Sequence, residues 1–256
     1  MAANIVVNDL SYTIADKKIL DEVSFNINEN TTIGIIGPNG SGKTTILKHL
    51  YRVLPAEKNK IFINGKALEH ITYRESAQII TVMKQENTSE FDYSILEIVL
   101  MGRAPYHNYM ERNNQQDFEI AQHAIEKVGM SDDMHRSFST LSGGEKQRVL
   151  IARSLAQQAD IFLLDEPTNH LDVRFQWTLM DLITSLKKTV LAVFHELNLA
   201  CHYCDYLLAV DKGKIIAYGT PEEVCTEHFL NTVFGIKVRV IQEEHKPYII
   251  YKGVMH

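Results

Sequence analysis

The stretch Gly37-Pro38-Asn39-Gly40-Ser41-Gly42-Lys43-Thr44 decides the fold, because it matches G-x-x-x-x-G-K-[ST] at every position. A short apolar run precedes it at 31–36, and a helical stretch, 45–50, follows it. Glycines let backbone N–H groups turn toward a phosphate, and a helix N-terminus adds partial positive charge. We therefore expect an α/β fold with a phosphate-binding loop, in which Lys43 reaches the β- and γ-phosphates and the Thr44 hydroxyl ligates Mg²⁺.

Two acids end a buried-looking run further along the chain. Residues 161–164 are apolar, and Asp165 and Glu166 follow them directly. In open α/β sheets, ligands collect at the carboxyl ends of the strands. We predict that Asp165 holds Mg²⁺, directly or through water, and that Glu166 is the general base for an attacking water. The alternative is a strand that ends in a solvated turn, and the complete phosphate loop favours the catalytic interpretation.

The first half of the chain combines strand and helix patterns. Residues 23–28 alternate apolar and polar, as a half-buried strand does, and 61–63 and 79–82 are further strand candidates. Residues 94–101 carry apolar side chains at helical spacing. The helix expected at 115–128 has an apolar face made of Phe118, Ala121, Ala124, Ile125 and Val128.

The second half follows a strand–helix–strand order. After the run at 161–164, an amphipathic helix is expected at 173–186 and a buried strand at 190–194, which together predict a parallel sheet. The apolar face of this helix consists of Val173, Trp177, Met180, Ile183 and Leu186. A hairpin is expected around Lys212-Gly213, and the weakly patterned end of the chain has one strand candidate, 248–251.

The composition excludes several classes of protein. The chain has 256 residues, between one and two domains at about 150 residues each. The net charge of −6 disfavours a nucleic-acid binder, which usually carries a basic face. No apolar run approaches the roughly 18 residues that indicate a membrane span, and no secretory signal is expected.

Three cysteines are too few for a disulfide scaffold and are typical of a reducing compartment. Cys201 and Cys204 have the spacing of a redox or metal motif. Because no second cysteine pair accompanies them, packing within a helix is the favoured interpretation.

Leu141-Ser142-Gly143-Gly144-Glu145-Lys146-Gln147, which precedes the two acids, resembles the signature sequence of ATP-binding cassette (ABC) ATPases. The resemblance extends over about residues 5–240. It implies a P-loop NTPase of ABC type, with a mixed-sheet core, an antiparallel β subdomain and an inserted helical subdomain at about 92–156. Residues 1–241 would form the ATPase domain, and 242–256 a short tail.

The resemblance also implies roles for single residues. Tyr12 would stack on adenine, and Gln85 would sense and ligate the metal. His195 would contact the γ-phosphate and hold Glu166, and Asp172 would support the partner's site. Each role has an alternative. Tyr12 could be an ordinary strand aromatic, and His195 could be a core histidine. Gln85, which lacks the usual preceding proline, could be a surface residue.

Ser142, Gly143 and Gly144 open an expected helix, so they form a second candidate anion site. Within one chain this site would duplicate the phosphate loop. The resemblance resolves the duplication: two cassettes pair head to tail, and each ATP lies between one chain's phosphate loop and the other chain's signature. The predicted nucleotide contacts are Tyr12, Gly37, Asn39, Gly40, Ser41, Gly42, Lys43, Thr44, Thr45, Ser142, Gly143, Gly144 and Asp172.

Finer similarities point to one group of importers. The segments 99–106, 168–172, 195–200 and 219–224 resemble ATPases that serve iron-siderophore, haem and cobalamin importers. The implied partners are a second copy of the chain, an integral membrane permease and, indirectly, a substrate-binding protein, with no nucleic acid. The implied location is the cytoplasmic face of the membrane.

The permease would dock between Gln85 and Tyr106, where Phe91, Tyr93 and Ile95 are candidate groove residues; for Ile95, packing in the chain's own core is favoured. The alternative function is a non-transport regulatory ATPase that uses the same groove for a soluble partner.

Overall fold

The computed structural model describes residues 4–84, 92–108, 110–169, 171–243 and 246–255. The strands are β1 Ile5–Ile14, β2 Lys17–Ile27, β3 Thr32–Ile36, β4 Ile61–Ile63, β5 Lys66–Ala67, β6 Ile80–Met83, β7 Ile161–Asp165, β8 Thr189–Val193, β9 Tyr206–Asp211, β10 Lys214–Gly219, β11 Ile236–Glu243 and β12 Lys246–Val254. The α-helices are α1 Lys43–Leu50, α2 Tyr73–Ile79, α3 Ile95–Leu100, α4 Gln115–Lys127, α5 Gly143–Ala156, α6 Val173–Ser185, α7 Leu197–Tyr203, α8 Pro221–Val224 and α9 Glu227–Phe234.

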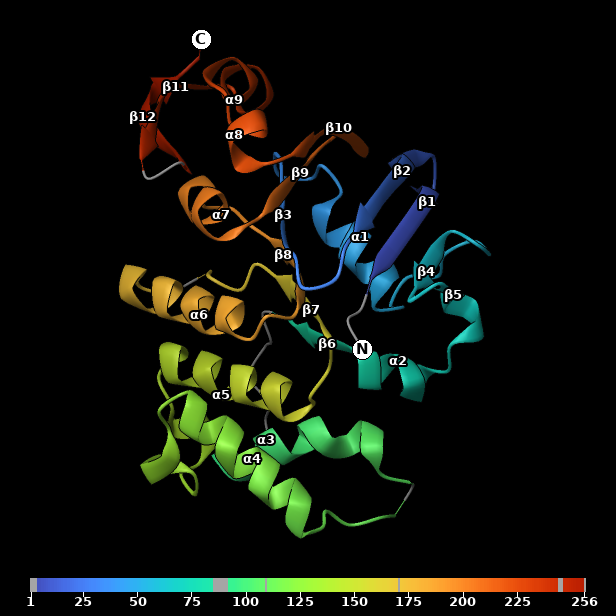
Figure 1. The fold of residues 1–256 in the computed structure, drawn as a ribbon, viewed down its shortest axis with the longest axis vertical. Coiled ribbons are helices and arrows are strands. Elements are labelled where there is room, and N and C mark those ends of the chain that lie inside the picture. Colours follow the sequence, from blue (N-terminus) through green and yellow to red (C-terminus); the bar gives the residue numbers. More distant parts are fainter. Residues whose placement is uncertain (1–3, 85–91, 109, 170, 244–245, 256) are drawn as a thin grey trace.

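The central sheet has the strand order β10-β9-β3-β8-β7-β6 (Figure 1). Strands β6, β7, β8, β3 and β9 run parallel, and β10 pairs antiparallel with β9. A separate antiparallel sheet has the order β2-β1-β4-β5. The predicted strand–helix–strand unit is confirmed as β7-α6-β8, and the predicted α/β fold with a mixed sheet and an antiparallel β subdomain is confirmed.

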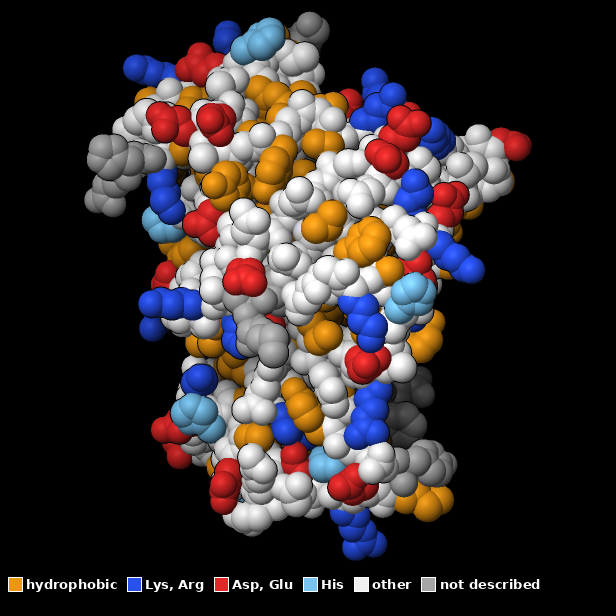
Figure 2. Space-filling model, turned by 45° about the vertical axis from the view of Figure 1, so that its right-hand side comes forward, with side chains coloured by type: hydrophobic (Ala, Val, Ile, Leu, Met, Phe, Trp, Pro, Cys, Tyr) orange, Lys and Arg blue, Asp and Glu red, His pale blue; other side chains and the backbone are white. Residues whose placement is uncertain are grey.

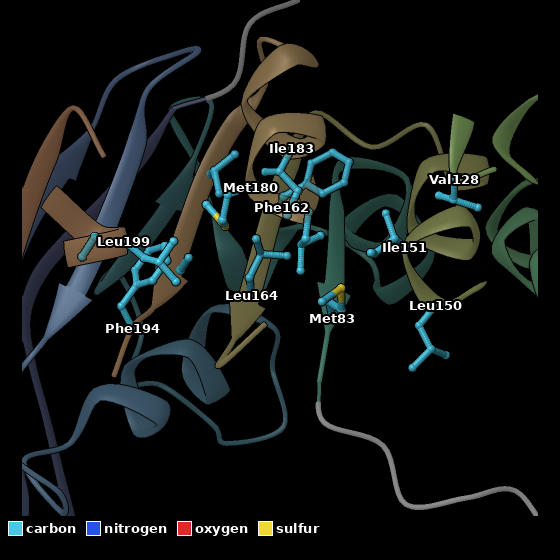
Figure 3. Close-up of a cluster of buried hydrophobic side chains, with 14 of the residues drawn as sticks. Met83, Val128, Leu150, Ile151, Phe162, Leu164, Met180, Ile183, Phe194 and Leu199 are labelled. Carbon is cyan, nitrogen blue, oxygen red and sulfur yellow. The ribbon is translucent and has the colours of Figure 1, made fainter. Parts of the chain in front are cut away.

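Alternation along the central strands divides the apolar interior in two. Ile161 and Leu163 of β7 belong to a cluster that also contains the buried residues of α1 and of the antiparallel sheet. Phe162 and Leu164 point to the opposite face, into a larger cluster with α3 to α7 (Figure 3). Because both faces are covered, the strand is a continuous apolar run, as expected for a parallel sheet.

Helices α3, α4 and α5 occupy the stretch between β6 and β7 and lie at one end of the molecule (Figure 1). Each begins at a side chain that accepts a hydrogen bond from the backbone of the first turn: Ser94, Asn114 and Ser142. In all three, an acidic side chain three residues later bonds back to the capping residue, a capping box.

Two predicted apolar faces differ from the structure. Phe118 of α4 is 36% exposed, and Val173 and Trp177 of α6 are 69% and 38% exposed. Trp177 contacts His202 and Tyr203 of α7 edge-on, with ring centroids 4.7 and 5.4 Å apart, so it lies on the flank of α6 instead of in the core.

The end of the chain is more ordered than its pattern predicts. β11 and β12 pair antiparallel along most of their length and form a two-stranded sheet of their own. The predicted boundary at 241 falls inside β11, so the hairpin, and not the stretch from 242 onward, is the structural unit.

The cysteines lie in the interior. Cys201 and Cys204 are buried in the larger cluster, and the Cys201 Sγ lies 3.3 Å from the Cys225 Sγ. Among the described residues no group of three His, Cys, Asp or Glu side chains is arranged to hold a metal ion.

The surface mixes acidic and basic side chains over the face drawn in Figure 2. No helix in the described ranges combines the length and the apolarity that crossing a bilayer requires.

Candidate functional site

The phosphate loop joins the end of β3 to the start of α1, at the edge of the sheet where the parallel strands end. Gly37 has a φ of 149°, and a Cβ there would lie 2.0 Å from the Val210 carbonyl oxygen. Gly42, at the N-cap of α1, has a φ of 109°, and a Cβ there would lie 2.8 Å from the Leu20 Cδ2 of β2. No side chain caps the first turn of α1, so its backbone N–H groups are available to a ligand.

One polar atom of the loop is buried without a partner. Ser41 is 3% exposed, and its Oγ has no hydrogen-bond partner. Buried polar groups are normally hydrogen-bonded, so this hydroxyl fits a loop that receives a polar ligand. Asn39 and Gly40 are exposed at the tip, and Thr45 is half-buried in the first turn of the helix.

Lys43 lies inside the loop, 5% exposed. Its Nζ donates to the Gly37 carbonyl at 2.8 Å and to the Pro38 carbonyl at 2.9 Å. Burial lowers the pKa of Lys43, and the nearby carboxylates of Glu166 and Asp165 partly offset this effect. The ammonium is therefore held within the loop that a phosphate would enter.

Thr44 and Asp165 meet although they are far apart in the sequence. The Thr44 Oγ1 donates to the Asp165 Oδ1 at 3.0 Å. Burial raises the pKa of Asp165, the hydrogen bond from Thr44 opposes this, and the Glu166 charge adds to the rise. A hydroxyl and a carboxylate at one point are oxygen ligands of the kind that Mg²⁺ prefers.

Glu166 is held from two sides just after β7. Its Oε1 lies 2.5 Å from the His195 Nε2, and its Oε2 accepts a hydrogen bond from the Asn169 side chain. β7 and β8 are parallel neighbours, with Asp165 paired to Val193, so the segments that follow the two strands emerge side by side. The structure therefore brings Lys43, Asp165, Glu166 and His195 to one edge of the sheet.

Asn169 was missed by the sequence reasoning. It follows Glu166 by one turn, and its backbone N–H also donates to the Glu166 carbonyl at 3.2 Å. The signal that could have revealed it is an amide side chain placed where the chain turns back after the strand.

The signature residues begin α5. Ser142 and Gly143 are exposed, and Gly144 is half-buried. The Ser142 Oγ donates to the Glu145 carboxylate at 2.8 Å and also caps the helix. Figure 1 shows α5 and α1 in different parts of the molecule, so one chain does not present its phosphate loop and its signature to the same space.

Asp172 is the N-cap of α6. Its Oδ1 accepts from the Phe175 N–H at 3.0 Å, and the residue is exposed. Gln147 of α5 connects the signature helix to the segment after Glu166, because its Nε2 donates to the Pro167 carbonyl at 3.0 Å.

Tyr12 lies half-buried in β1 and packs against the smaller cluster and His49 of α1. The two rings meet edge-on, with centroids 4.8 Å apart and planes at 77°. Ile14, two residues later on the same strand, is 54% exposed. The role of Tyr12 at adenine stays a prediction.

Gln85 and Phe91 lie outside the described residues. Of the other candidate docking residues, Ile95 is fully buried in α3, and Tyr93 is half-buried against the larger cluster. Ile95 therefore packs the chain's own core.

Comparison with known protein families gives one match to the sequence. A family model described as ABC transporter matches residues 20–169. Its match begins in β2 and ends just after β7, so it includes the phosphate loop, the signature and Glu166.

Several curated bacterial proteins are similar over nearly the whole chain. The petrobactin import ATP-binding protein FpuC of Bacillus anthracis is 32% identical, covering 98% of this chain and 93% of that protein. The hemin import ATP-binding protein HmuV of Deinococcus radiodurans is 38% identical, covering 93% of each. An uncharacterized ABC transporter ATP-binding protein of Bacillus subtilis, YvrA, is 38% identical, but this chain covers only 56% of its length.

Solved structures share the fold. A chain from a transporter assigned to the metal-chelate type, in an inward-facing conformation, superposes with a TM-score of 0.84 at 25% identity, covering 98% of both chains. An ATP-binding cassette of an ABC transporter in its ADP conformation gives a TM-score of 0.77 at 25% identity, covering 87% of this chain and 93% of that one.

Proposed function

The chain belongs to the ABC transporter family, and on that premise we propose that it is the ATP-hydrolysing subunit of an importer for iron chelates. The observation that carries the proposal is the position of Glu166, held by His195 and Asn169 beside the phosphate loop. The cargo class is suggested by relatives whose names refer to petrobactin and hemin import. A ferric siderophore or haem is thus the proposed cargo, and the sequence resemblance adds cobalamin as an alternative.

ATP would bind with its phosphates in the loop. The uncapped N–H groups of α1, the Lys43 ammonium and the unpartnered Ser41 hydroxyl supply donors there. Mg²⁺ would be held by Thr44 and Asp165, with Gln85 as the third predicted ligand; when bound, it neutralises charge on the phosphates.

Hydrolysis is in-line attack of water on the γ-phosphorus, so catalysis is mainly positioning and charge stabilisation. Glu166 would orient the water and accept its proton. His195, at 2.5 Å from Glu166, would fix that carboxylate and contact the γ-phosphate. Lys43 would stabilise the negative charge of the transferring group.

The second half of each site would come from another copy of the chain. Ser142 and Gly143 are exposed at the N-terminus of α5, which supports a contact with the γ-phosphate bound by a partner. Asp172 would support the same interface. Two such contacts related by a two-fold axis make an isologous dimer.

We further propose that this dimer docks on a separate permease at the cytoplasmic face of the membrane. A substrate-binding protein would deliver the cargo to the permease. The stretch 85–106 is the proposed docking segment, with Tyr93 as its candidate contact.

The test is reconstitution of the chain with its permease and binding protein in vesicles. We expect ferric siderophore or haem to stimulate ATP hydrolysis, and the same complex with Glu166→Gln to show no stimulation. Stimulation by a sugar or an amino acid alone would contradict the cargo class. Failure to copurify with any multi-span membrane protein would favour the regulatory ATPase instead.

A further inference from the structure

One side chain fastens the C-terminal hairpin to α7. The Asn198 Nδ2 donates to the Ile249 carbonyl at 3.1 Å, and the Asn198 Oδ1 accepts from the Ile249 N–H at 2.8 Å. The carboxamide therefore bonds both backbone groups of a residue on β12, as a neighbouring strand would. Ile249 is 1% exposed and Asn198 is half-buried, so the contact is partly shielded from solvent.

The same asparagine is connected to the catalytic edge of the sheet. Its backbone N–H donates to the Glu196 Oε1 at 3.1 Å, and Glu196 caps the N-terminus of α7. Glu196 follows His195 directly, and the His195 Nε2 lies 2.5 Å from Glu166. A continuous set of contacts thus runs from the hairpin through Asn198 to the candidate base.

The helix that carries this connection needs outside support. α7 has seven residues, and an isolated helix this short is unstable in water, so its position depends on tertiary contacts. His195 lies in the short link between β8 and α7 and is 39% exposed at its side chain.

We infer that the C-terminal hairpin of β11 and β12 positions the catalytic histidine, His195. Asn198 is the positioning residue that connects the hairpin to the link carrying His195. The inference rests on the proposed function, because it needs His195 to act in hydrolysis. The family model ends at residue 169 and does not cover these residues.

The test compares steady-state hydrolysis and nucleotide affinity in the full chain. Asn198→Ala removes both bonds to Ile249, and we expect kcat to fall about tenfold, since a misplacement of about 1 Å costs up to about 10²-fold. The Kd for ATP should stay unchanged, because the phosphate loop is not touched. Asn198→Asp, which keeps the size but loses the donor, should lower kcat as well.

Glu227→Ala is the matched control. The Glu227 Oε1 accepts from the Val240 N–H at 2.9 Å, so this variant loosens the hairpin from α9 instead of α7. We expect it to lower the Tm but to leave kcat unchanged. In a His195→Ala background, Asn198→Ala should cause no further loss of kcat.

Three outcomes would overturn the inference, and they are distinguishable. A wild-type kcat in Asn198→Ala would show that the hairpin does not position His195, and so would equal losses of kcat in Asn198→Ala and Glu227→Ala. Either result would leave the role of His195 in hydrolysis intact. Wild-type kcat in His195→Ala would remove that role itself, and with it the part of the proposed function on which the inference depends.

Discussion

Glu166 has the backbone conformation that marks it as a constrained residue. Its φ is 55°, in the left-handed region, which costs a non-glycine residue roughly 1–2 kcal/mol. Two side chains, His195 and Asn169, contact its carboxylate oxygens. Strain of this kind is typical of functional sites, where the surrounding structure sustains it.

The first prediction concerns this carboxylate. Glu166→Gln keeps the shape but cannot accept a proton, so we expect kcat to fall by at least about 10²-fold. ATP binding should be retained, because the phosphate loop is unchanged. Turnover measured by phosphate release, together with the Kd for a fluorescent ATP analogue, checks both parts. Turnover equal to wild type would show that another group is the base.

The second prediction concerns Lys43. Hydrogen bonds to charged groups contribute about 1.5–3 kcal/mol, so we expect Lys43→Ala to raise the Kd for ATP at least about tenfold. Lys17→Ala, on the exposed part of β2, is the control with the same charge change. Equal affinities in the two variants would argue against the phosphate-loop role of Lys43.

The third prediction separates two roles for Tyr12. If Tyr12 stacks on adenine as predicted, Tyr12→Leu should raise the Kd for ATP, since base–aromatic stacking contributes about 1–3 kcal/mol. A role limited to the edge-on contact with His49 would lower the Tm and leave the Kd unchanged. Thermal unfolding and nucleotide titration of the same variant distinguish the outcomes, and Ile14→Ala tests the neighbouring exposed side chain.

At the scale of elements, α1 carries the phosphate loop at one end and a buried histidine at the other. His49 is 1% exposed, and neither ring nitrogen has a hydrogen-bond partner. Burial lowers the pKa of His49 below its usual 6.5. Protonation of His49 is therefore less favourable in the folded protein than in the unfolded chain.

The fourth prediction follows from the sign of that shift. As the pH falls below 6.5, the unfolded chain binds a proton that the folded chain does not, so the free energy of unfolding should decrease. His49→Leu should lose less stability than wild type between pH 7 and the folded-state pKa. Denaturant unfolding at a series of pH values measures the difference. Parallel pH profiles would contradict the assignment.

Local sequence patterns predicted some of the elements and contacts of this fold but not others. Contiguous patterns predicted the phosphate loop, the buried run of β7 and the hairpin of β9 and β10, because each depends on neighbouring residues. Trp177 was assigned to a buried face because spacing shows the direction of a side chain but not what covers it. The bonds between Asn198 and Ile249 join residues on separate elements, and no local pattern encodes such a pair.

The candidate site also combines residues that local motifs predict with residues that they do not. Motifs predicted Lys43, Thr44, Asp165 and Glu166. The contacts of Asn169 and of the hairpin form only in the folded chain, so no motif predicted them. Tyr12 has the residue type expected of a base-stacking group, and its ring meets His49 edge-on. Its role at adenine stays a prediction.

At the scale of the whole molecule, the phosphate loop and the signature, which we propose as two half-sites, do not face one another. The phosphate loop follows β3, and the signature opens α5 at the end formed by the inserted helices (Figure 1). A second copy, turned about a two-fold axis, would bring each half to its complement. ATP would then be buried between two chains and would hold them together.

The pairing of two chains around ATP is tested most directly by the mass of Glu166→Gln in solution at millimolar ATP. This mass is determined by size-exclusion chromatography with light scattering. Without hydrolysis the ATP-bound dimer should persist, so the mass should be about twice the 29.2 kDa of one chain. Adding Ser142→Arg to this variant should restore the single-chain mass, because the signature could no longer approach the partner's ATP. A single-chain mass for Glu166→Gln with ATP bound, at every ATP concentration, would contradict the paired-site mechanism.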